Sequence, residues 1–135
     1  MILLLVCSLL QIEAKDRCVL VTAEVRKEPP QIELRWPADP KASAYTVSRK
    51  APSDASWIDV GEALDAKETY YVDASVQVGV VYEYRILKSA QAGDKPFKGS
   101  GYIQAGIDVP LRDNRGKVVL VVDATQATPL AEPLR

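Results

Sequence analysis

One stretch of the sequence, residues 76–86, constrains the fold of this chain more than any other. Gly79 precedes a strict alternation in which apolar residues stand at positions 80, 82, 84 and 86. Alternation with a period of two predicts a β-strand with one buried and one more exposed face. A tyrosine near the start of such a strand, here Tyr82, can fill the edge of a core while its hydroxyl bonds to the backbone of the crossing loop. The stretch therefore predicts a β-sandwich closed by a tyrosine corner.

Short apolar segments separated by turn-forming residues continue this pattern along the chain. Most of the nine prolines stand at the junctions between segments, where a missing N–H does no harm. Regularly spaced short strands with turn signals predict an all-β sandwich. Residues 62–68 favour a helix locally but are too few to form a stable one, so we expect a connecting turn there. The seven predicted strands cover residues 18–25, 32–36, 44–49, 57–60, 69–72, 80–89 and 101–107.

The ordered series of segments resembles the fibronectin type III family. Residues 32–37 (Ile-Glu-Leu-Arg-Trp-Pro) are similar to its second strand, and residues 44–47 (Ala-Tyr-Thr-Val) to its third. Residues 76–82 resemble its tyrosine-corner motif, with valines where the family has leucine, proline and threonine. The resemblance covers residues 18–109 and implies a seven-stranded immunoglobulin-like sandwich. The expected inter-sheet core consists of Trp36, Tyr45, Val47, Tyr82, Tyr84 and Ile86.

Composition argues against several classes of function. The 135 residues include no histidine, which is the commonest general base and metal ligand, and no Gly-rich phosphate loop. The 17 basic and 18 acidic residues are interspersed, so nucleic acid is not an expected partner. We therefore assign no catalytic, cofactor-binding or metal-binding residue and predict a non-enzymatic module. The glycines in Gly99-Ser-Gly101 are expected to mark a bend or a bulge.

The chain begins with an apolar run, residues 1–10, that is too short to span a bilayer as a helix. It fits the core of a secretory signal peptide covering residues 1–14, with Ile12 and Ala14 at the cleavage positions, although no basic residue precedes it. The alternative is a buried first strand. Cleavage would remove Cys7 and leave Cys18 without an intramolecular partner. We predict a secreted or cell-envelope protein whose mature chain has no transmembrane segment.

Beyond Pro110 the character of the sequence changes. Residues 117–122 form an unbroken apolar run, typical of strands buried on both faces, and Thr128-Pro129 predicts a helix start. Residues 115–123 resemble the opening of α/β domains that follow fibronectin-like modules in secreted bacterial proteins, gingipain-like cysteine peptidases among them. The resemblance implies that residues 110–135 are a linker and the start of a second domain. A plain linker or an added edge strand is the alternative.

Aromatic side chains are the remaining candidates for binding. Adjacent Tyr70 and Tyr71 must point to opposite faces of their strand. Phe97 is expected near the tip of a loop, residues 91–98, between the last two strands. Core packing is the favoured interpretation for each ring, because large aromatics are mostly buried. Those kept as candidate exposed binding residues are Trp57, Tyr71, Tyr102 and Phe97.

These observations predict a spacer or docking module of a secreted or cell-surface bacterial multidomain protein. Its expected partner is a neighbouring domain of the same polypeptide, or a protein or polysaccharide surface. Two alternatives stay open. One is an accessory fragment of a secreted hydrolase, and the other is a carbohydrate-binding sandwich, which would need at least two coplanar exposed rings.

Overall fold

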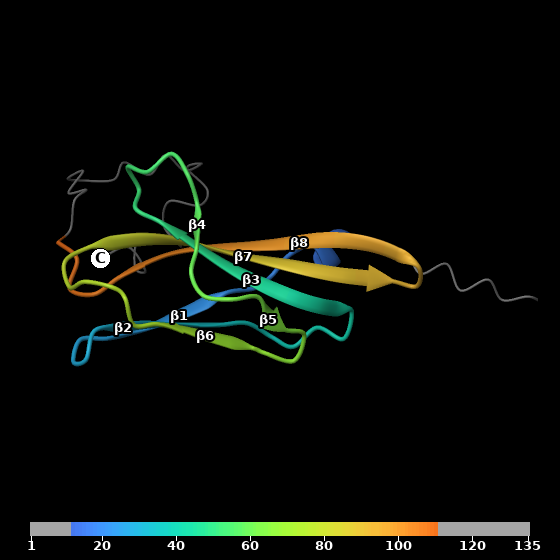
Figure 1. Ribbon diagram of the computed structural model, residues 1–135, viewed down its shortest axis with the longest axis horizontal. Coiled ribbons are helices and arrows are strands. Elements are labelled where there is room, and N and C mark those ends of the chain that lie inside the picture. Colours follow the sequence, from blue (N-terminus) through green and yellow to red (C-terminus); the bar gives the residue numbers. More distant parts are fainter. Residues whose placement is uncertain (1–11, 111–135) are drawn as a thin grey trace, which may run out of the picture.

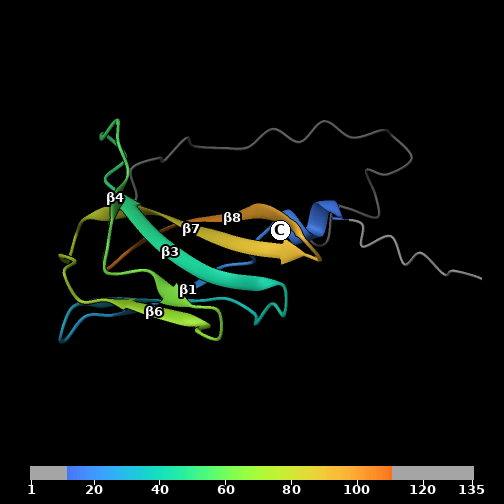
Figure 2. The same cartoon turned by 45° about the vertical axis from the view of Figure 1, so that its right-hand side comes forward.

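Two antiparallel β-sheets pack face to face in the computed structural model, which describes residues 12–110 (Figure 1). One sheet has the strand order β1-β2-β6, and the other has the order β4-β3-β7-β8, with β5 also pairing with β3. Figure 2 shows the two layers, with β3, β7 and β8 above β1 and β6. The elements are η1 (Ala14–Arg17), β1 (Thr22–Arg26), β2 (Gln31–Arg35), β3 (Ala42–Lys50), β4 (Ile58–Asp59), β5 (Leu64–Asp65), β6 (Tyr70–Asp73), β7 (Val81–Ala92) and β8 (Lys95–Gly106).

This arrangement confirms the predicted all-β sandwich. The chain crosses between the sheets from β2 to β3, from β5 to β6 and from β6 to β7, so each sheet is built from strands distant in sequence. Such crossings are those of an immunoglobulin-like fold. The predicted connecting turn at residues 62–68 contains the short strand β5. The predicted C-terminal strand and helix start, at residues 111–135, lie outside the described residues.

Strand β7 is the centre of the larger sheet and shows the alternation expected from the sequence. It pairs with β3 on one side and with β8 on the other. Tyr84 and Ile86 are fully buried toward the opposite sheet, whereas Glu83 and Arg85 keep some exposure on the outer face. Every second side chain of β7 therefore serves the core, and the others build the outer surface of the sheet.

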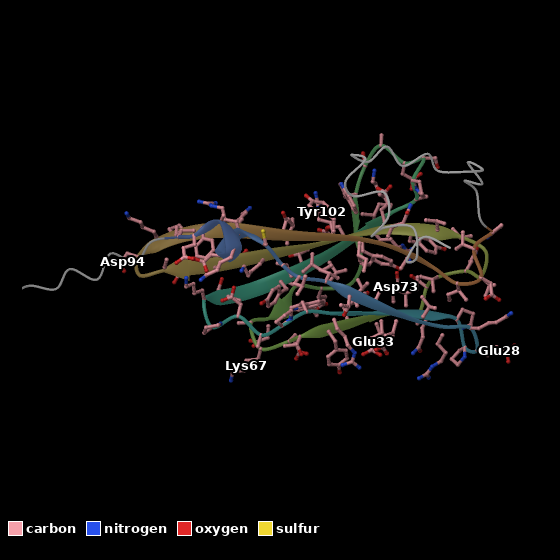
Figure 3. All side chains as sticks on the ribbon, turned by 180° about the vertical axis from the view of Figure 1, so that it is seen from behind. Glu28, Glu33, Lys67, Asp73, Asp94 and Tyr102 are labelled. Atoms are coloured by element: carbon pink, nitrogen blue, oxygen red, sulfur yellow. The ribbon has the colours of Figure 1, made fainter. Side chains whose placement is uncertain are left out.

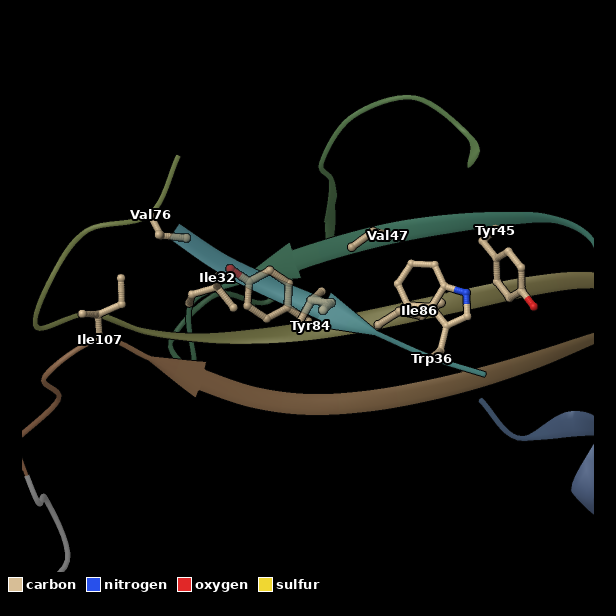
Figure 4. Packing of buried hydrophobic residues seen from close by; sticks show 9 residues of the cluster. Ile32, Trp36, Tyr45, Val47, Val76, Tyr84, Ile86 and Ile107 are labelled. Carbon is tan, nitrogen blue, oxygen red and sulfur yellow. The ribbon is translucent and has the colours of Figure 1, made fainter. Parts of the chain in front are cut away.

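The hydrophobic core lies between the two sheets (Figure 4). The rings of Trp36 and Tyr45 meet with centroids 5.3 Å apart, and the Trp36 indole N–H donates to the Glu68 carbonyl at 3.0 Å. The buried members of the core cluster are Ile32, Leu34, Trp36, Tyr45, Val47, Val76, Tyr84, Ile86 and Ile107. Four of these, Ile32, Leu34, Val76 and Ile107, were not among the residues expected from the sequence.

Tyr82 lies at the edge of this core and makes the corner contact expected of it. Its ring is partly buried against the cluster, and its hydroxyl accepts a hydrogen bond from the Gln77 backbone N–H at 3.1 Å. Gly79, between them, has a φ of 82°, which is the left-handed region that favours glycine. Its N–H donates to the Ile107 carbonyl at 2.7 Å. The corner thereby joins the start of β7 to the segment that follows β8.

The N-terminal segment changes sheets, which corrects the predicted strand at residues 18–25. Cys18 forms an isolated bridge with Ser100 of β8, and the Val19 N–H donates to the Ser100 carbonyl at 3.0 Å. The chain then joins β2 in the other sheet only from Thr22 onward. Residues 18–21 thus close one open side of the sandwich.

Gly99 and Gly101 make room for this segment, so the prediction of a bend or bulge there is wrong. The register between β7 and β8 continues without interruption through both positions. A Cβ on Gly101 would lie 2.2 Å from the Val19 carbonyl oxygen, and one on Gly99 would lie 3.1 Å from the backbone of Arg17. These two positions require glycine because a side chain would collide with the N-terminal segment, and not because the backbone has an unusual conformation.

The predicted loop at residues 91–98 is also wrong. β7 continues to Ala92 and β8 begins at Lys95, with Gly93 at a φ of 58° in the tight turn. A glycine with positive φ permits a short hairpin connection that suits the twist of the strands. Phe97 therefore lies within β8, is only 6% exposed and packs against Ala90, Ala92 and Ile12. It is not an exposed binding residue.

The close approach of the N-terminal segment to Gly99 and Gly101 yields a first prediction. Gly101→Ala should lower the free energy of unfolding by about 1–3 kcal/mol, because the new methyl group collides with the Val19 carbonyl. Chemical denaturation measures the change. Ser100→Ala, on the neighbouring position, is the control and should cost much less. Equal stability of Gly101→Ala and wild type would contradict the close approach.

The tyrosine corner yields a second prediction. Tyr82→Phe should lower the free energy of unfolding by about 1 kcal/mol, because the Gln77 N–H loses its acceptor while the ring packing remains. Tyr102→Phe, which removes a hydroxyl from an exposed ring, is the matched control and should leave stability unchanged. A denaturation midpoint for Tyr82→Phe equal to that of the control would show that the hydrogen bond contributes nothing.

Candidate functional site

A cluster of aromatic and charged side chains occupies the outer face of the sheet formed by β3, β7 and β8. Trp57, which directly precedes β4, lies over this face. The Arg85 guanidinium is 4.9 Å from the centroid of the Trp57 ring, and Lys50 Nζ is 5.2 Å from it. Cations at such distances are attracted to the ring. The two contacts hold Trp57 partly buried above the sheet surface.

Tyr102 stands next to Trp57 and is the most exposed aromatic residue of the described chain. It belongs to β8, and 64% of its surface is accessible. The centroids of the two rings are 6.0 Å apart, and their planes are inclined by 56°. Because of this inclination, Trp57 and Tyr102 do not form the coplanar platform expected of a sandwich that binds flat polysaccharide surfaces. Figure 3 shows Tyr102 on the outside of one layer and Glu33 on the outside of the other.

Between these rings the surface is hollowed. The hollow has a volume of about 290 Å³ and is lined by Trp57, Glu83, Tyr84, Tyr102, Ile103 and Gln104. Glu83 is paired with Gln104 across the β7–β8 ladder, so both side chains project to the same face. The Glu83 carboxylate also forms an ion pair with Lys50 at 3.1 Å. The hollow thus combines two aromatic side chains with one carboxylate and one amide.

A hydrogen-bonded layer supports the cluster from below. Ser48, which is fully buried, donates from its hydroxyl to the Asp59 carboxylate at 2.7 Å. The Arg85 guanidinium donates to the same hydroxyl at 3.1 Å. Because Arg85 is held from the sheet side, it presents a fixed surface to the Trp57 ring. The sequence analysis did not find Arg85, Glu83 or Gln104, since only the strand register reveals which outward residues surround Trp57.

The other candidate aromatics are distributed elsewhere. Tyr71 is partly buried against the core, and its hydroxyl lies close to Gly61. Tyr70 points to the opposite side of β6, is 49% exposed and has the Arg35 guanidinium 5.9 Å from its ring centroid. Of the four rings kept as candidate binding residues, the structure brings together only Trp57 and Tyr102.

A second polar cluster is buried between the sheets around Asp73. This residue, at the end of β6, is 2% exposed. Its carboxylate accepts hydrogen bonds from the Tyr84 hydroxyl at 3.0 Å, from the Ser75 N–H at 2.9 Å and from the Ser75 hydroxyl at 2.7 Å. The Arg49 guanidinium completes the set as an ion pair. Arg49 and Tyr84 belong to the opposite sheet, so the cluster joins the two layers.

The pKa values of this cluster follow from its contacts. Burial by itself would raise the pKa of the Asp73 carboxyl, but the hydrogen bonds from Ser75 and Tyr84 and the charge of Arg49 outweigh it. The pKa of Asp73 therefore lies below its ordinary value. Burial and the neighbouring Asp73 charge raise the pKa of the Tyr84 hydroxyl. Each group is kept in the charge state that its partners require, which is the behaviour of a structural cluster.

A third polar cluster lies beside the N-terminal segment. Asp16 of η1, which is 9% exposed, forms an ion pair with Lys41 at 2.8 Å, and that contact lowers the pKa of the Asp16 carboxyl. Lys88, which is 2% exposed on the core side of β7, is paired with Asp39. The Tyr45 hydroxyl is buried nearby without a hydrogen-bond partner in the described chain. The ion pairs fasten the N-terminal segment and the loop before β3 to the end of the sandwich.

Two negative findings apply to residues 12–110. In that range no group of three or more His, Cys, Asp or Glu side chains is placed to hold a metal ion. Residues 12–110 also contain no helix that could span a lipid bilayer.

Comparison with known proteins gives similarity to solved structures. The sequence matches no protein-family model and no curated protein. Among solved structures, the chain is similar to an Fn3-like protein from Clostridium thermocellum, with a TM-score of 0.45 and 21% sequence identity over 70% of this chain and 92% of that one. The strand order by itself defines the class of fold: an immunoglobulin-like β-sandwich, in which a three-stranded sheet faces the β4-β3-β7-β8 sheet.

The buried carboxylate yields a third prediction. Asp73→Asn should lower the free energy of unfolding at neutral pH by about 3 kcal/mol, because Arg49 and Tyr84 lose a charged partner between the sheets. Since the pKa of Asp73 is lowered by folding, its stabilising contribution is present at neutral pH and is lost as the pH falls below about 4.

Denaturation curves measured from neutral to acidic pH test both parts. The stability difference between wild type and Asp73→Asn should shrink as the medium becomes acidic. Asp94→Asn, in the exposed turn of the β7–β8 hairpin, is the control and should stay close to wild type throughout. A difference that does not change with pH would exclude Asp73 as the titrating group.

Proposed function

We propose that residues 12–110 form a non-catalytic spacer module that holds flanking parts of a longer polypeptide at a defined separation. The observation that carries this proposal is the placement of the two ends of the described chain. The backbone of Arg17, at the end of η1, lies against Gly99 in the half of β8 nearer the β7–β8 hairpin, whereas residues 107–110 follow the opposite end of β8 (Figure 1). A module entered at one end and left at the other separates its neighbours by its own length.

The way the ends are fastened supports the same role. Asp16 and Lys41 anchor the entering segment, and the hydrogen bond between Gly79 and Ile107 anchors the leaving one. Both anchors connect segments distant in sequence, so the ends are fixed to the body of the sandwich. A rigid module fixes the distance between the parts of the chain on either side of it, whereas a flexible linker of the same composition would not.

The chemistry of the polar clusters also favours a structural module. The buried carboxylate of Asp73 is committed to Arg49, Tyr84 and Ser75, and the ion pairs at the other end join chain segments. A general base requires a pKa near the working pH, and the lowered pKa of Asp73 is far from it. These carboxylates therefore stabilise the fold.

The wider setting is part of the proposal. The apolar run at residues 1–10 supports secretion or placement at the cell surface, and residues 117–122 support a following α/β domain. In that setting the module would be an accessory to its neighbouring domain. A gingipain-like hydrolase is one candidate for that neighbouring domain. That candidate depends on residues 115–123, which lie outside the described part of the chain.

A distance measurement tests the spacer role and is the fourth prediction. Spin labels at Lys15→Cys and Val109→Cys, in a chain with Cys7→Ser and Cys18→Ser, should give one narrow distance distribution by pulsed electron paramagnetic resonance. The same labels in denaturant provide the broad reference. A broad distribution in the folded protein would show that the ends are not held and would overturn the proposal.

A further inference from the structure

We propose that the hollow between Trp57 and Tyr102 binds a single residue of a neutral sugar chain. This inference goes beyond the spacer role, which requires no ligand. It depends on four properties of the outer face of the β3, β7 and β8 sheet: the ring faces, the polar groups between them, the balance of charge and the inclination of the rings.

The rings supply the apolar part of the site. An aromatic face carries partial negative charge, so it attracts the slightly positive C–H groups on the flat side of a pyranose. Tyr102, with 64% of its surface accessible, offers such a face. Trp57 forms the second wall and is already held by Arg85 and Lys50. A wall that is fixed before the ligand arrives loses little conformational entropy on binding.

The polar groups in the hollow match vicinal hydroxyls. Glu83 and Gln104 are direct partners on neighbouring strands, so a carboxylate and an amide stand side by side. The carboxylate accepts hydrogen bonds, and the amide both donates and accepts. Two adjacent sugar hydroxyls can use this pair together. Both groups lie on regular strands, which place them more precisely than loops would.

The charges select a neutral ligand. Lys50 is paired with the Glu83 carboxylate at 3.1 Å, and Arg85 donates to the Ser48 hydroxyl, which in turn donates to Asp59. Lys50 compensates the Glu83 carboxylate, and Arg85 contacts the Ser48 hydroxyl and the Trp57 ring, although its buried Nε has no hydrogen-bond partner in the described chain. An anionic polysaccharide would have to break one of these contacts, whereas a neutral sugar needs no such exchange.

The inclination of the rings limits the ligand to one residue at a time. At 56° between the planes, two consecutive sugars of a flat chain cannot stack on both rings. A chain end, or one unit of a twisted chain, can enter the hollow of about 290 Å³. A single unit makes few contacts, so we expect a dissociation constant of about 1 mM.

Titration of the full chain with soluble neutral oligosaccharides, namely cellohexaose, laminarihexaose, mannohexaose and chitohexaose, tests the proposal. Nuclear magnetic resonance separates the two tryptophan indole N–H signals. At least one oligosaccharide should shift the Trp57 signal while the signal of Trp36, which is buried between the sheets, stays in place. Absence of any shift with all four at about 10 mM would overturn the proposal.

Variants with matched controls locate the site. Tyr102→Ala should weaken binding at least about tenfold, and Tyr102→Phe should retain it, because the ring and not the hydroxyl makes the contact. Tyr70→Ala removes the other strongly exposed tyrosine, on the opposite sheet, and should leave affinity unchanged. Equal losses in Tyr102→Ala and Tyr70→Ala would contradict the assignment of the site.

Two further ligands complete the test. Polygalacturonate should not shift the Trp57 signal, and binding of this anion in place of the neutral sugars would overturn the charge argument. A proline-rich peptide should also have no effect. If the peptide alone shifts Trp57, the surface is a protein interface and the sugar proposal is wrong.

Discussion

The carboxylate of Asp73 is the constraint on which the packing of the two sheets depends. A buried charge without partners costs several kcal/mol, and its partners here come from both layers. Arg49 and Tyr84 reach Asp73 from the larger sheet, while Ser75 caps it from its own segment. A shift of one sheet relative to the other would separate these groups. Hydrophobic contacts between Trp36, Tyr45 and Ile86 favour close packing of the sheets. The Asp73 cluster determines their alignment, because the contacts of Asp73 with Arg49 and Tyr84 form in only one relative position of the sheets.

The sides of the sandwich are closed by backbone as much as by side chains. Residues 18–21 lie along β8 because Gly101 and Gly99 have no side chain to obstruct them. At the opposite end, the corner at Tyr82 and the hydrogen bond from Gly79 fasten the chain after β8. Closing both sides leaves the outer faces of the sheets free. The outer face with Trp57 and Tyr102 is therefore available for contacts without any cost to the core.

Much of the fold could be predicted from residue patterns, and the errors have physical causes. Alternation around Tyr82, Tyr84 and Ile86 predicted the central strand because burial on one face leaves a period of two. The loop expected at residues 91–98 is strand instead, since Gly93 permits a tight turn that no hydrophobic pattern reports. Gly99 and Gly101 were expected to disturb the strand, yet their neighbours come from residues 17–19, far away in sequence. For the candidate site, the sequence indicated Trp57 and Tyr102 as candidates but did not indicate that the two rings are neighbours.

What the sequence by itself determined is the class of structure: an all-β sandwich with an aromatic core and a tyrosine corner, because strand periodicity and turn chemistry are local properties. The tertiary structure alone decided how the outward residues combine. Glu83, Arg85 and Gln104 alternate with core residues and carry no signal of their own. They lie around Trp57 only because the β7–β8 register aligns them and the chain before β4 lies over them. Register depends on contacts between segments distant in the chain, and no short pattern of residues contains them.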